Sequence, residues 1–533
     1  MSLTQLSQQP GQVESLIKDA PYQPDPLALY QHLCRERGNT LLLESAEIDS
    51  KDNLKSLILT DAAVRLECRG HQVNAVALTD NGQAVLPVLA EYSGAEVSEQ
   101  GLTQLTLTYP PADAELDEDA RLKAHSVFDS LRACVQRLTP LRDHPQAVFL
   151  GGVFAYDLLA GFEPLPEVPD GDNDCPDFVF YLAETLILVD HQSRSSQIIG
   201  SVFSGEQVAN HYFAVSQRVE QLYQALGENL PEPTAPTASV SAESLKVSKS
   251  DAEFKQDVLN LKEHILAGDI FQVVPSRTFS LPCPDAYLAY ARLKQQNPSP
   301  YMFYLQDQDF TIFGASPESA LKYTQSNREV EVYPIAGTRP RGFNHDGSIN
   351  RDLDSRIELN LREDDKEKAE HLMLVDLARN DIARVSEPGS RYVKDLLKVD
   401  RYSHVMHLVS RVVGTLRSDL DALHAYQACM NMGTLVGAPK VMAARLIREV
   451  EGERRGSYGG AVGYMNGHGD LDTCIVIRSA FVKNQTAYIQ AGAGVVFDSE
   501  PQSEADETRG KAQAVIRAVI DAHQCPIKEN DHG

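Results

Sequence analysis

The sequence predicts an α+β protein built in layers. Segments rich in β-branched and aromatic residues are mixed with amphipathic helical segments, without the strict alternation that a doubly wound parallel sheet requires. Hydrophobic residues make up 42% and charged residues 23% of the 533 residues, the balance of a globular chain. A chain of this length predicts roughly two to four structural units.

The N-terminal part combines strands and helices up to a polar segment. Residues 56–70 and 177–192 have strand-like content, and residues 120–138 have helical periodicity. Residues 228–247 are rich in Pro, Thr, Ser and Ala and cannot bury much surface. We therefore predict an N-terminal region at 1–227, a linker or exposed loop at 228–247, and a second region at 248–533.

The second region opens with an amphipathic helix at 250–269, with Ser250 as its N-cap. Strands are predicted at 271–281, 311–319, 329–337 and 473–477. Two further helices are predicted at 363–385 and 503–523. In the last of these, Ser503 is the expected N-cap, because Asp506 follows three residues later as in a capping box.

Charge and targeting signals exclude several classes of function. The chain has 49 Lys and Arg residues and 75 Asp and Glu residues, so its net charge is 49 − 75 = −26. This negative charge opposes nonspecific binding to nucleic acid or to an anionic membrane. The N-terminus lacks the pattern of a signal peptide, and no apolar run of about 18 residues is present. Eight cysteines are scattered without a CxxC pair. We expect a cytoplasmic protein that binds neither nucleic acid nor membrane.

Two of the predicted helices carry clustered carboxylates. Glu367 and Glu370 share one helix face, and Glu504, Glu507 and Lys511 share another. Two such helices could hold Mg²⁺, which accepts a few carboxylates and keeps exchangeable waters. Glutamates on helices more often lie on solvated faces, so the spacing alone leaves both interpretations open.

A candidate anion site lies between these helices. Arg478 follows the strand at 473–477, and Gly492 and Gly494 flank Ala493. Arginine suits a carboxylate, and glycine lets backbone amides approach an anion. Glycines at a strand bulge would give the same pattern. The sequence contains no GxGxxG before a helix, Walker A loop, HExxH motif or GxSxG elbow.

Eight ordered motifs resemble those of the chorismate-utilising enzymes. They lie between about residues 251 and 519: GDIFQVVPSR, GASPES, PIAGTRPRG, AEHLMLVDLARND, GSYGGAVGY, CIVIRS, QAGAGVV and PQSEADETRGKA. The segments LLLESAEI and NPSPYMFYL are similar to those of the anthranilate-forming members of that family. The resemblance implies layered antiparallel sheets with helices packed outside, the active site in a cleft, and a catalytic region at 248–533.

The resemblance also implies a Mg²⁺ site and a set of substrate contacts. Glu370 and Glu507 match the metal ligands, and Glu367 and Glu504 match the acidic residues that support them. The residues expected to contact chorismate are Gly337, Thr338, Tyr458, Arg478, Gly492, Ala493 and Gly494, where the glycine segment would donate backbone amides.

Three residues are expected to act in the reaction. Glu318 matches the general acid that protonates the departing C4 hydroxyl, and Lys511 is expected to add positive charge at the bound carboxylate. His407 corresponds to a histidine implicated in the later elimination.

Two positions discriminate between nucleophiles within the family. Members that add water carry lysine where this chain has Gln272, and aminodeoxychorismate synthases of the usual bacterial kind carry lysine where it has Ala336. Without either lysine, ammonia is expected to attack C2 directly. The 2-amino-2-deoxyisochorismate formed would lose pyruvate and give anthranilate, the first step of tryptophan biosynthesis.

The expected partner and inhibitor follow from the same resemblance. None of the cysteines lies in a glutaminase-like GxCxG elbow, so a separate glutamine amidotransferase subunit is expected to supply ammonia, in a heterotetramer. Tryptophan is expected to inhibit by binding near Ser45, Pro300, Tyr301 and Met302.

Two rival interpretations stay open at this point. The chain could be an aminodeoxychorismate, isochorismate or salicylate synthase, against which Ala336 and Gln272 count. It could also be a non-catalytic amino-acid sensor, although such a protein need not retain together the four residues Glu318, Glu370, Arg478 and Glu507.

Overall fold

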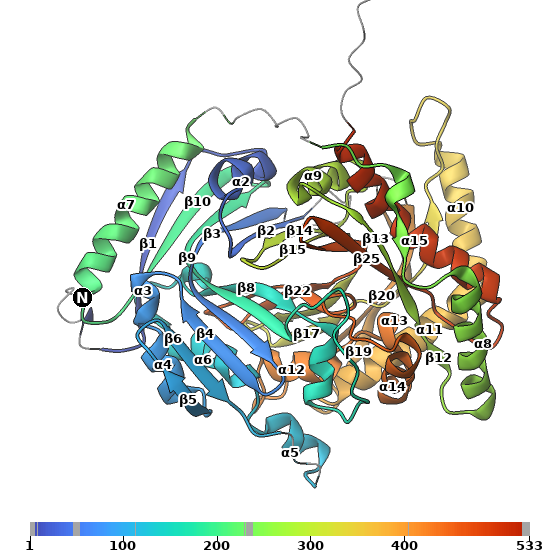
Figure 1. Cartoon of the computed structure of the whole chain (residues 1–533), viewed down its shortest axis with the longest axis horizontal. Coiled ribbons are helices and arrows are strands. Elements are labelled where there is room, and N and C mark those ends of the chain that lie inside the picture. Colours follow the sequence, from blue (N-terminus) through green and yellow to red (C-terminus); the bar gives the residue numbers. More distant parts are fainter. Residues whose placement is uncertain are drawn as a thin grey trace, which may run out of the picture.

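The computed structural model shows strands and helices arranged in layers (Figure 1). It describes residues 6–524, except residues 8, 46–53, 112, 114, 229, 231–237 and 403–404. Most of its strands join a single 23-stranded sheet that branches at its centre. The branches meet at β3 (Lys55–Arg69) and β9 (Phe178–Asp190), which pair with each other.

The first branch leaves β3 and runs to β11. Its strands, in order, are β2 (Thr40–Glu44), β14 (Tyr301–Gln306), β15 (Thr311–Ser316), β24 (Ser479–Lys483), β25 (Thr486–Gly492), β13 (Ser276–Pro282) and β11 (Lys246–Val247).

The second branch leaves β9 and carries most of the candidate site. Its strands, in order, are β8 (Phe149–Phe154), β22 (Ala461–Asn466), β23 (Leu471–Ile475), β16 (Ser319–Thr324), β17 (Glu329–Val332) and β20 (Val405–Thr415), and β20 also pairs with β18 (Ile335–Pro340) and β19 (Tyr392–Arg401).

The remaining strands extend the centre or stand apart. Beside β9 and β3 lie β10 (Ser195–Phe203), β1 (Gln12–Ala20), β7 (Thr139–Pro140), β4 (Gln72–Ala77), β6 (Gln104–Thr108) and β5 (Glu96–Gln100); β12 (Gln272–Val273) pairs only with β21 (Gly437–Ala438). Among the pairings of described strands, β1 with β7 is parallel and the others are antiparallel.

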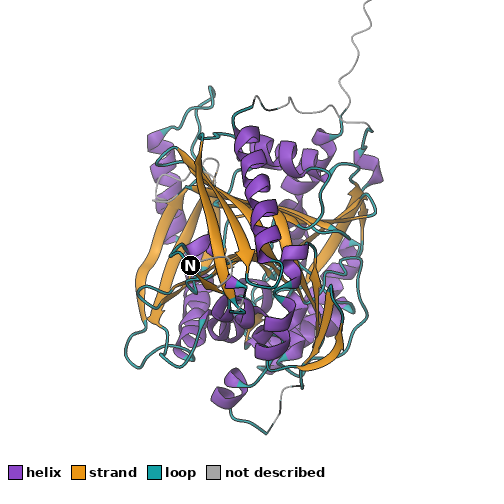
Figure 2. Ribbon diagram, turned by 90° about the vertical axis from the view of Figure 1, so that its left-hand side faces the viewer, coloured by secondary structure: helices purple, strands orange, loops and turns teal. Residues whose placement is uncertain are grey.

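Helices flank the strands (Figure 2). They are α2 (Pro26–Cys34), α3 (Asp80–Gln83), α4 (Leu86–Tyr92), α5 (Glu118–Lys123), α6 (Phe128–Arg137), α7 (Val208–Leu226), α8 (Asp251–Ala267), α9 (Ala286–Gln296), α10 (Arg351–Glu363), α11 (Asp365–Ala383), α12 (Ala422–Cys429), α13 (Gly433–Val436), α14 (Lys440–Glu451) and α15 (Pro501–Ala522), with 3₁₀ turns η1 (Pro145–Ala147), η2 (Tyr156–Gly161) and η3 (Ala242–Ser244). Among the helices that the structure describes, none combines length with enough apolar character to span a bilayer.

The alternation of side chains along the strands builds the core. Leu41 and Phe303 join a cluster shared by both branches, whereas their neighbours Leu42 and Tyr304 join the cluster that α9 and α15 cover. Successive side chains of a strand point to opposite faces, so each strand can bury both. The predicted α+β fold of layered antiparallel sheets with helices outside is confirmed.

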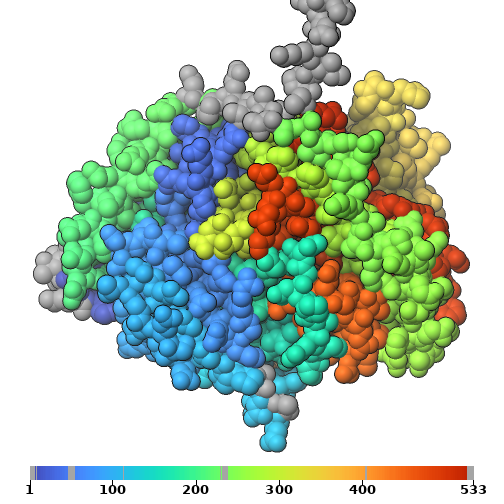
Figure 3. Space-filling view, viewed as in Figure 1, coloured from blue at the N-terminus to red at the C-terminus, as the bar shows by residue number. Residues whose placement is uncertain are grey.

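The predicted regions are interlocked rather than merely adjacent. Strand β2 pairs with β14, and β8 pairs with β22, so strands from both sides of residues 228–247 are hydrogen-bonded to each other. The space-filling view shows N-terminal and C-terminal colours meeting on one continuous face (Figure 3). Part of the predicted linker lies outside the described residues, and its end forms β11. The domain boundaries stay a prediction about sequence organisation.

Helix α8 confirms the predicted start, and two other helix predictions are wrong in detail. Ser250 caps α8 in a capping box with Glu253. Helix α15 begins earlier than predicted, with Glu500 rather than Ser503 as N-cap, because Pro501 already has the backbone angle of a first helical residue. The helix predicted at 120–138 is two helices, since Ala124 is extended and the Asp129 carboxylate accepts a hydrogen bond from the Ser126 amide.

A buried ion pair anchors the segment that leads to the candidate site. Arg455 is almost fully buried and donates to Glu451 at 2.6 and 2.8 Å. It also donates to the carbonyl oxygens of Leu435 and Val274 at 2.8 and 2.6 Å. The guanidinium thereby fixes the chain just before Tyr458.

Removing the carboxylate of this pair is expected to destabilise the fold. Glu451→Ala leaves the Arg455 charge buried without a counter-ion, and we expect it to lower the free energy of unfolding by about 3–5 kcal/mol. The matched control is Glu449→Ala on the same helix, where the half-exposed carboxylate contributes about 1 kcal/mol or less. Urea unfolding followed by circular dichroism measures both, and equal stability of the two variants would contradict this role for Glu451.

Candidate active site

Glu318 is a buried carboxyl at the start of β16. Only 7% of its surface is exposed, and burial raises its pKa to about 8. The Thr434 hydroxyl donates to Glu318 Oε1 at 3.1 Å, and the Ile335 amide and the positive charge of Lys511 partly oppose the rise. Below pH 8 this carboxyl therefore holds a proton, which is the state that a general acid needs.

His407 lies on β20, opposite Thr338 of β18. The Thr338 hydroxyl and His407 Nδ1 are 2.9 Å apart. Burial, with the nearby Arg478 charge, lowers the pKa of His407 to about 4. The imidazole is therefore neutral at pH 7, with one ring nitrogen that can donate a hydrogen bond and one that can accept it.

The backbone conformation and the close packing at position 337 of β18 require glycine. The φ of Gly337, 78°, suits glycine. A Cβ there would lie 3.0 Å from Glu367 Oε2. The structure thus brings the carboxylate of α11 against the predicted substrate loop.

Tyr458 and Arg478 form the buried wall of the site. Arg478 has a φ of 49° after β23, and burial lowers its pKa despite the charges of Tyr458 and Glu507. Burial raises the pKa of Tyr458 to about 12. A desolvated guanidinium beside a phenol that keeps its proton is suited to bind a carboxylate.

Lys511 connects α15 to this wall. Its Nζ donates to the Gly492 carbonyl at 3.0 Å and pairs with Glu507 at 2.7 Å. Its charge also acts on Glu318. The structure therefore brings together the predicted catalytic, carboxylate-binding and α15 residues.

The backbone of the glycine segment, residues 492–494, is less available to a ligand than predicted. The Ala493 amide donates to the Pro275 carbonyl at 3.1 Å. A Cβ at Gly492 would lie 3.1 Å from the Tyr458 hydroxyl, and a Cβ at Gly494 would lie 2.9 Å from Gln272 Nε2. The close packing explains both glycines, whereas the amide role of Ala493 stays a prediction that this hydrogen bond does not support.

The four carboxylates fit Mg²⁺ by chemistry, although Glu367 and Glu507 pair with basic side chains. Glu367 pairs with Arg339 at 2.8 Å, and Glu507 pairs with Lys511. Glu370 is half-buried on α11 and Glu504 is buried on α15. Within the described ranges, no three metal-binding side chains gather, but Mg²⁺ needs only one or two carboxylates besides substrate oxygens and water.

Gln272 is buried with an unsatisfied carbonyl oxygen, which the sequence could not reveal. Gln272 is 6% exposed, and its Oε1 is buried without a hydrogen-bond partner. A buried acceptor without a donor is costly, and a bound ligand that donates would remove that cost.

The residues predicted to bind tryptophan also come together, on the first branch. Met302 pairs with Glu44, the residue before Ser45, and Pro300 and Tyr301 open the same strand region. Glu44 accepts hydrogen bonds from Tyr290 and Lys294 at 2.8 and 2.6 Å. These contacts join residues 246 and 250 positions apart in the sequence, so no local pattern could have predicted them.

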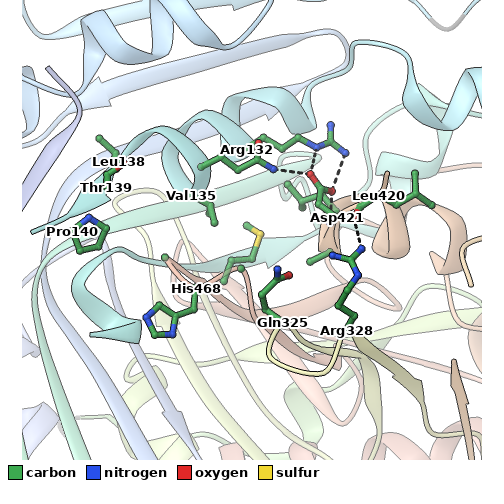
Figure 4. A pocket seen from close by; sticks show the side chains of 16 residues that line it. Arg132, Val135, Leu138, Thr139, Pro140, Gln325, Arg328, Leu420, Asp421 and His468 are labelled. Carbon is green, nitrogen blue, oxygen red and sulfur yellow. Dashed lines mark hydrogen bonds and ion pairs between the residues drawn. The ribbon is translucent and has the colours of Figure 1, made fainter. Parts of the chain in front are cut away.

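Another cavity lies away from these residues. It has a volume of about 400 Å³ beside α6, and Figure 4 shows Arg132 of its wall directed at Asp421, to which it donates at 2.8 Å. None of its described lining residues belongs to the predicted site. Its guanidiniums already have carboxylate or carbonyl partners, so we assign it no ligand.

Comparisons with known proteins identify the family of the chain. The family model of chorismate binding enzymes matches residues 95–517. The chain is 59% identical over 514 residues to anthranilate synthase component 1 of Vibrio cholerae, covering 96% of this chain and 97% of that protein. It is 58% identical to the protein of the same name from Escherichia coli, covering 96% and 98%.

Solved structures support the same grouping. Anthranilate synthase component I from Streptococcus pneumoniae superposes with a TM-score of 0.67 at 27% identity, covering 92% of this chain and 97% of that one. The menaquinone-specific isochorismate synthase of Escherichia coli shares the fold, with a TM-score of 0.64 at 17% identity and 97% coverage of both chains. The predicted resemblance is confirmed, and the chain belongs to the family of chorismate binding enzymes.

Proposed function

We propose that the chain is the chorismate-converting subunit of an anthranilate synthase. The observation that carries this proposal is the buried carboxyl of Glu318, whose pKa is raised to about 8 by burial and which accepts a hydrogen bond from the amide of Ile335. The next residue, Ala336, offers only a methyl group where a relative would place its own amine. The high identity to proteins named anthranilate synthase component 1 supports the same activity.

The proposed reaction assigns one task to each part of the site. Arg478 and Tyr458 hold a substrate carboxylate, and Lys511 adds positive charge beside them. Ammonia forms a bond to C2 while the C4–oxygen bond breaks, and Glu318 gives its proton to the leaving hydroxyl, which departs as water. His407, neutral and paired with Thr338, is placed to assist the later loss of pyruvate.

Gln272 supports ammonia rather than water as the nucleophile. Its unpartnered carbonyl oxygen would accept an N–H of ammonia, and an amide cannot act as the base that would activate water. The intermediate is then 2-amino-2-deoxyisochorismate, and loss of pyruvate gives anthranilate.

Mg²⁺ completes the proposed site. Glu370 and Glu507 would hold it with support from Glu367 and Glu504, and it would neutralise the substrate ring carboxylate in a chain of charge −26. Because Glu507 also pairs with Lys511, metal binding would compete with that ion pair.

Removing one proposed metal ligand gives a direct prediction. Glu507→Gln is expected to raise the Mg²⁺ concentration for half-maximal activity by about 10-fold or more. The matched control is Asp506→Asn on the same helix, whose exposed carboxylate pairs with Arg509. A Mg²⁺ titration of initial rates measures both, and an unchanged Mg²⁺ requirement in Glu507→Gln would remove this residue from the metal site.

The proposed biological setting includes a partner and an inhibitor. Because no glutaminase elbow occurs in the sequence, a separate glutamine amidotransferase subunit would supply the ammonia. The two kinds of subunit would form a heterotetramer in the cytoplasm. L-Tryptophan would bind near Ser45 and residues 300–302. Tyr301, which hydrogen-bonds Ser319 beside Glu318, offers a physical connection from that region to the catalytic acid.

One assay tests the proposed function. The purified chain, chorismate, Mg²⁺ and ammonium chloride should yield fluorescent anthranilate and an equal amount of pyruvate. Glutamine should not replace ammonium in the absence of the partner. Accumulation of isochorismate or 4-amino-4-deoxychorismate would contradict the proposal.

A further inference from the structure

Tyr402 packs against the imidazole of His407. The two ring centroids are 5.2 Å apart and the ring planes are inclined by 60°, which is an edge-on contact. Tyr402 directly follows β19, and its amide donates to the Val405 carbonyl at 2.8 Å. This hydrogen bond joins the end of β19 to the start of β20, the strand that carries His407. The aromatic ring is therefore held where the two strands meet.

The imidazole of His407 is contacted from both neighbouring strands. Strand β20 lies between β18 and β19 in the sheet. On the β18 side, the Thr338 hydroxyl lies 2.9 Å from His407 Nδ1. The torsion that rotates an imidazole about its Cβ–Cγ bond has broad minima, so a single hydrogen bond does not fix the plane of the ring. The contact with Tyr402 on the other side restricts that rotation.

The phenol of Tyr402 also lies within the electrostatic field of Glu318. Burial raises the pKa of Tyr402, and the charges of Asp400 and Glu318 raise it further. Tyr402 therefore keeps its proton at pH 7 and presents a neutral aromatic ring to the imidazole. The ring lies close to both of the side chains, Glu318 and His407, to which the proposed reaction assigns a step.

Arg341 fixes the backbone that carries Tyr402. Its Nη1 donates to the Tyr402 carbonyl. Its Nε and Nη2 donate to the two carboxylate oxygens of Asp354 on α10, at 2.8 and 3.0 Å. Both side chains of this ion pair are mostly buried, so a shift of the Tyr402 carbonyl would leave a buried donor unpaired. The second arginine of the PIAGTRPRG motif thereby anchors the residue that packs on His407.

Loss of pyruvate needs a fixed orientation of the histidine. In this step C2 loses a proton, the C3–oxygen bond breaks, and the side chain leaves as enolpyruvate, which takes up a proton to become pyruvate. A side chain that assists proton transfer must lie within hydrogen-bonding reach of its target, and a displacement of about 1 Å can cost about 100-fold in rate. The preceding addition of ammonia depends on Glu318 instead.

We propose that Tyr402 is a positioning residue that holds the imidazole of His407 in the orientation required for loss of pyruvate, with Arg341 holding Tyr402 in turn. The proposal rests on the proposed function, because it assigns Tyr402 to the second step of that reaction. The aromatic ring supplies the effect, since it is the ring that packs on the imidazole.

Single-turnover kinetics of the purified chain separate the two steps. Excess enzyme is mixed with chorismate, ammonium chloride and Mg²⁺, and chorismate, 2-amino-2-deoxyisochorismate and anthranilate are quantified by chromatography after quenching. Tyr402→Leu is expected to slow the loss of pyruvate by about tenfold, so that the intermediate accumulates. Chorismate consumption should change by less than about threefold.

Two further variants sharpen this comparison. Tyr402→Phe keeps the ring and should restore the rate of pyruvate loss to within about threefold of the unmodified chain. The matched control is Tyr392→Leu, because Tyr392 lies at the other end of β19 and is 53% exposed. It should release no more intermediate than the unmodified chain.

A double-mutant cycle tests whether Tyr402 acts through His407. The variant His407→Ala removes the imidazole that Tyr402 orients. In that background, Tyr402→Leu should lower the rate of pyruvate loss by less than about twofold further. A loss as large as that in the presence of His407 would overturn the proposal, because Tyr402 would then act independently of the histidine.

Arg341→Lys tests the same arrangement from its other end. Lysine keeps the positive charge but cannot reproduce the guanidinium fork between Asp354 and the Tyr402 carbonyl. The variant should therefore slow the loss of pyruvate more than the consumption of chorismate. Arg356→Lys, at an exposed position of α10, is its control. If Tyr402→Leu fails to fold, Arg341→Lys decides the question.

The outcomes separate this proposal from the function on which it rests. If the unmodified chain makes no anthranilate from chorismate and ammonium, the proposed function fails and the role of Tyr402 with it. If it does, but folded Tyr402→Leu releases no more intermediate than Tyr392→Leu, the positioning role is wrong. A Tyr402→Phe variant as impaired as Tyr402→Leu would also overturn it, since the hydroxyl rather than the ring would then act.

Discussion

Replacing Glu318 by glutamine is expected to lower kcat for anthranilate formation by about 10²–10⁴-fold, the usual contribution of a general acid. Glutamine has nearly the same shape but no proton to give to the leaving hydroxyl. The Thr434 hydroxyl can still donate to the amide oxygen, so we expect the fold and chorismate binding to persist. Steady-state anthranilate fluorescence measures the loss.

The pH dependence provides a second readout of the same residue. Because the pKa of Glu318 is about 8, its carboxyl is protonated below that pH and active as an acid. The rate of the proton-transfer step should therefore fall as pH rises through about 8, and Glu318→Gln should lose this dependence. Exposed Glu263 on α8 provides the control Glu263→Gln. A Glu318→Gln variant that stays within tenfold of the unmodified rate would remove Glu318 from the chemistry.

Ala336→Lys is expected to lower anthranilate formation by about 100-fold or more. Ala336 lies on β18, directly before Gly337 and Thr338. A lysine there would place its own amine where free ammonia should attack. Ala336→Ser, which stays small, should retain most activity. Initial rates with saturating ammonium measure both variants.

Unchanged activity of Ala336→Lys would contradict this role for position 336. If the Ala336→Lys variant is folded and has the same kinetics as the unmodified chain, position 336 does not face C2 of chorismate. The assignment of ammonia as the attacking nucleophile would then lose its main residue-level support.

Local signals predicted the parts of the fold that local interactions determine. Helix α8 was predicted with its N-cap because Ser250 and Glu253 satisfy each other's backbone groups within one turn. The break between α5 and α6 was not predicted, since it depends on the Asp129 carboxylate reaching back to Ser126. Helix α10 was missed altogether, although Asn350 caps it.

Motifs identified the site residues but not the state of their side chains. Glu318 and Lys511 were named from the sequence, yet the burial that raises the pKa of Glu318 comes from strands far apart in the chain. The carbonyl oxygen of Gln272 is buried without a hydrogen-bond partner, and its amide nitrogen packs close to Gly494 in a distant part of the sequence. Asp381 and Lys440 form a hydrogen-bonded ion pair across 59 positions of the sequence, so no local pattern could have predicted it.

Isotope labelling tests the central claim, direct attack of ammonia on C2 of chorismate, most directly. The purified chain is incubated with chorismate, Mg²⁺ and ¹⁵N-ammonium in ¹⁸O-water, and the products are separated for mass spectrometry and NMR. The proposed chemistry predicts anthranilate with ¹⁵N on the ring carbon adjacent to the carboxyl-bearing carbon, no ¹⁸O on the ring, and one pyruvate for each anthranilate. A product with ¹⁸O at C2, or with ¹⁵N at C4, would contradict it.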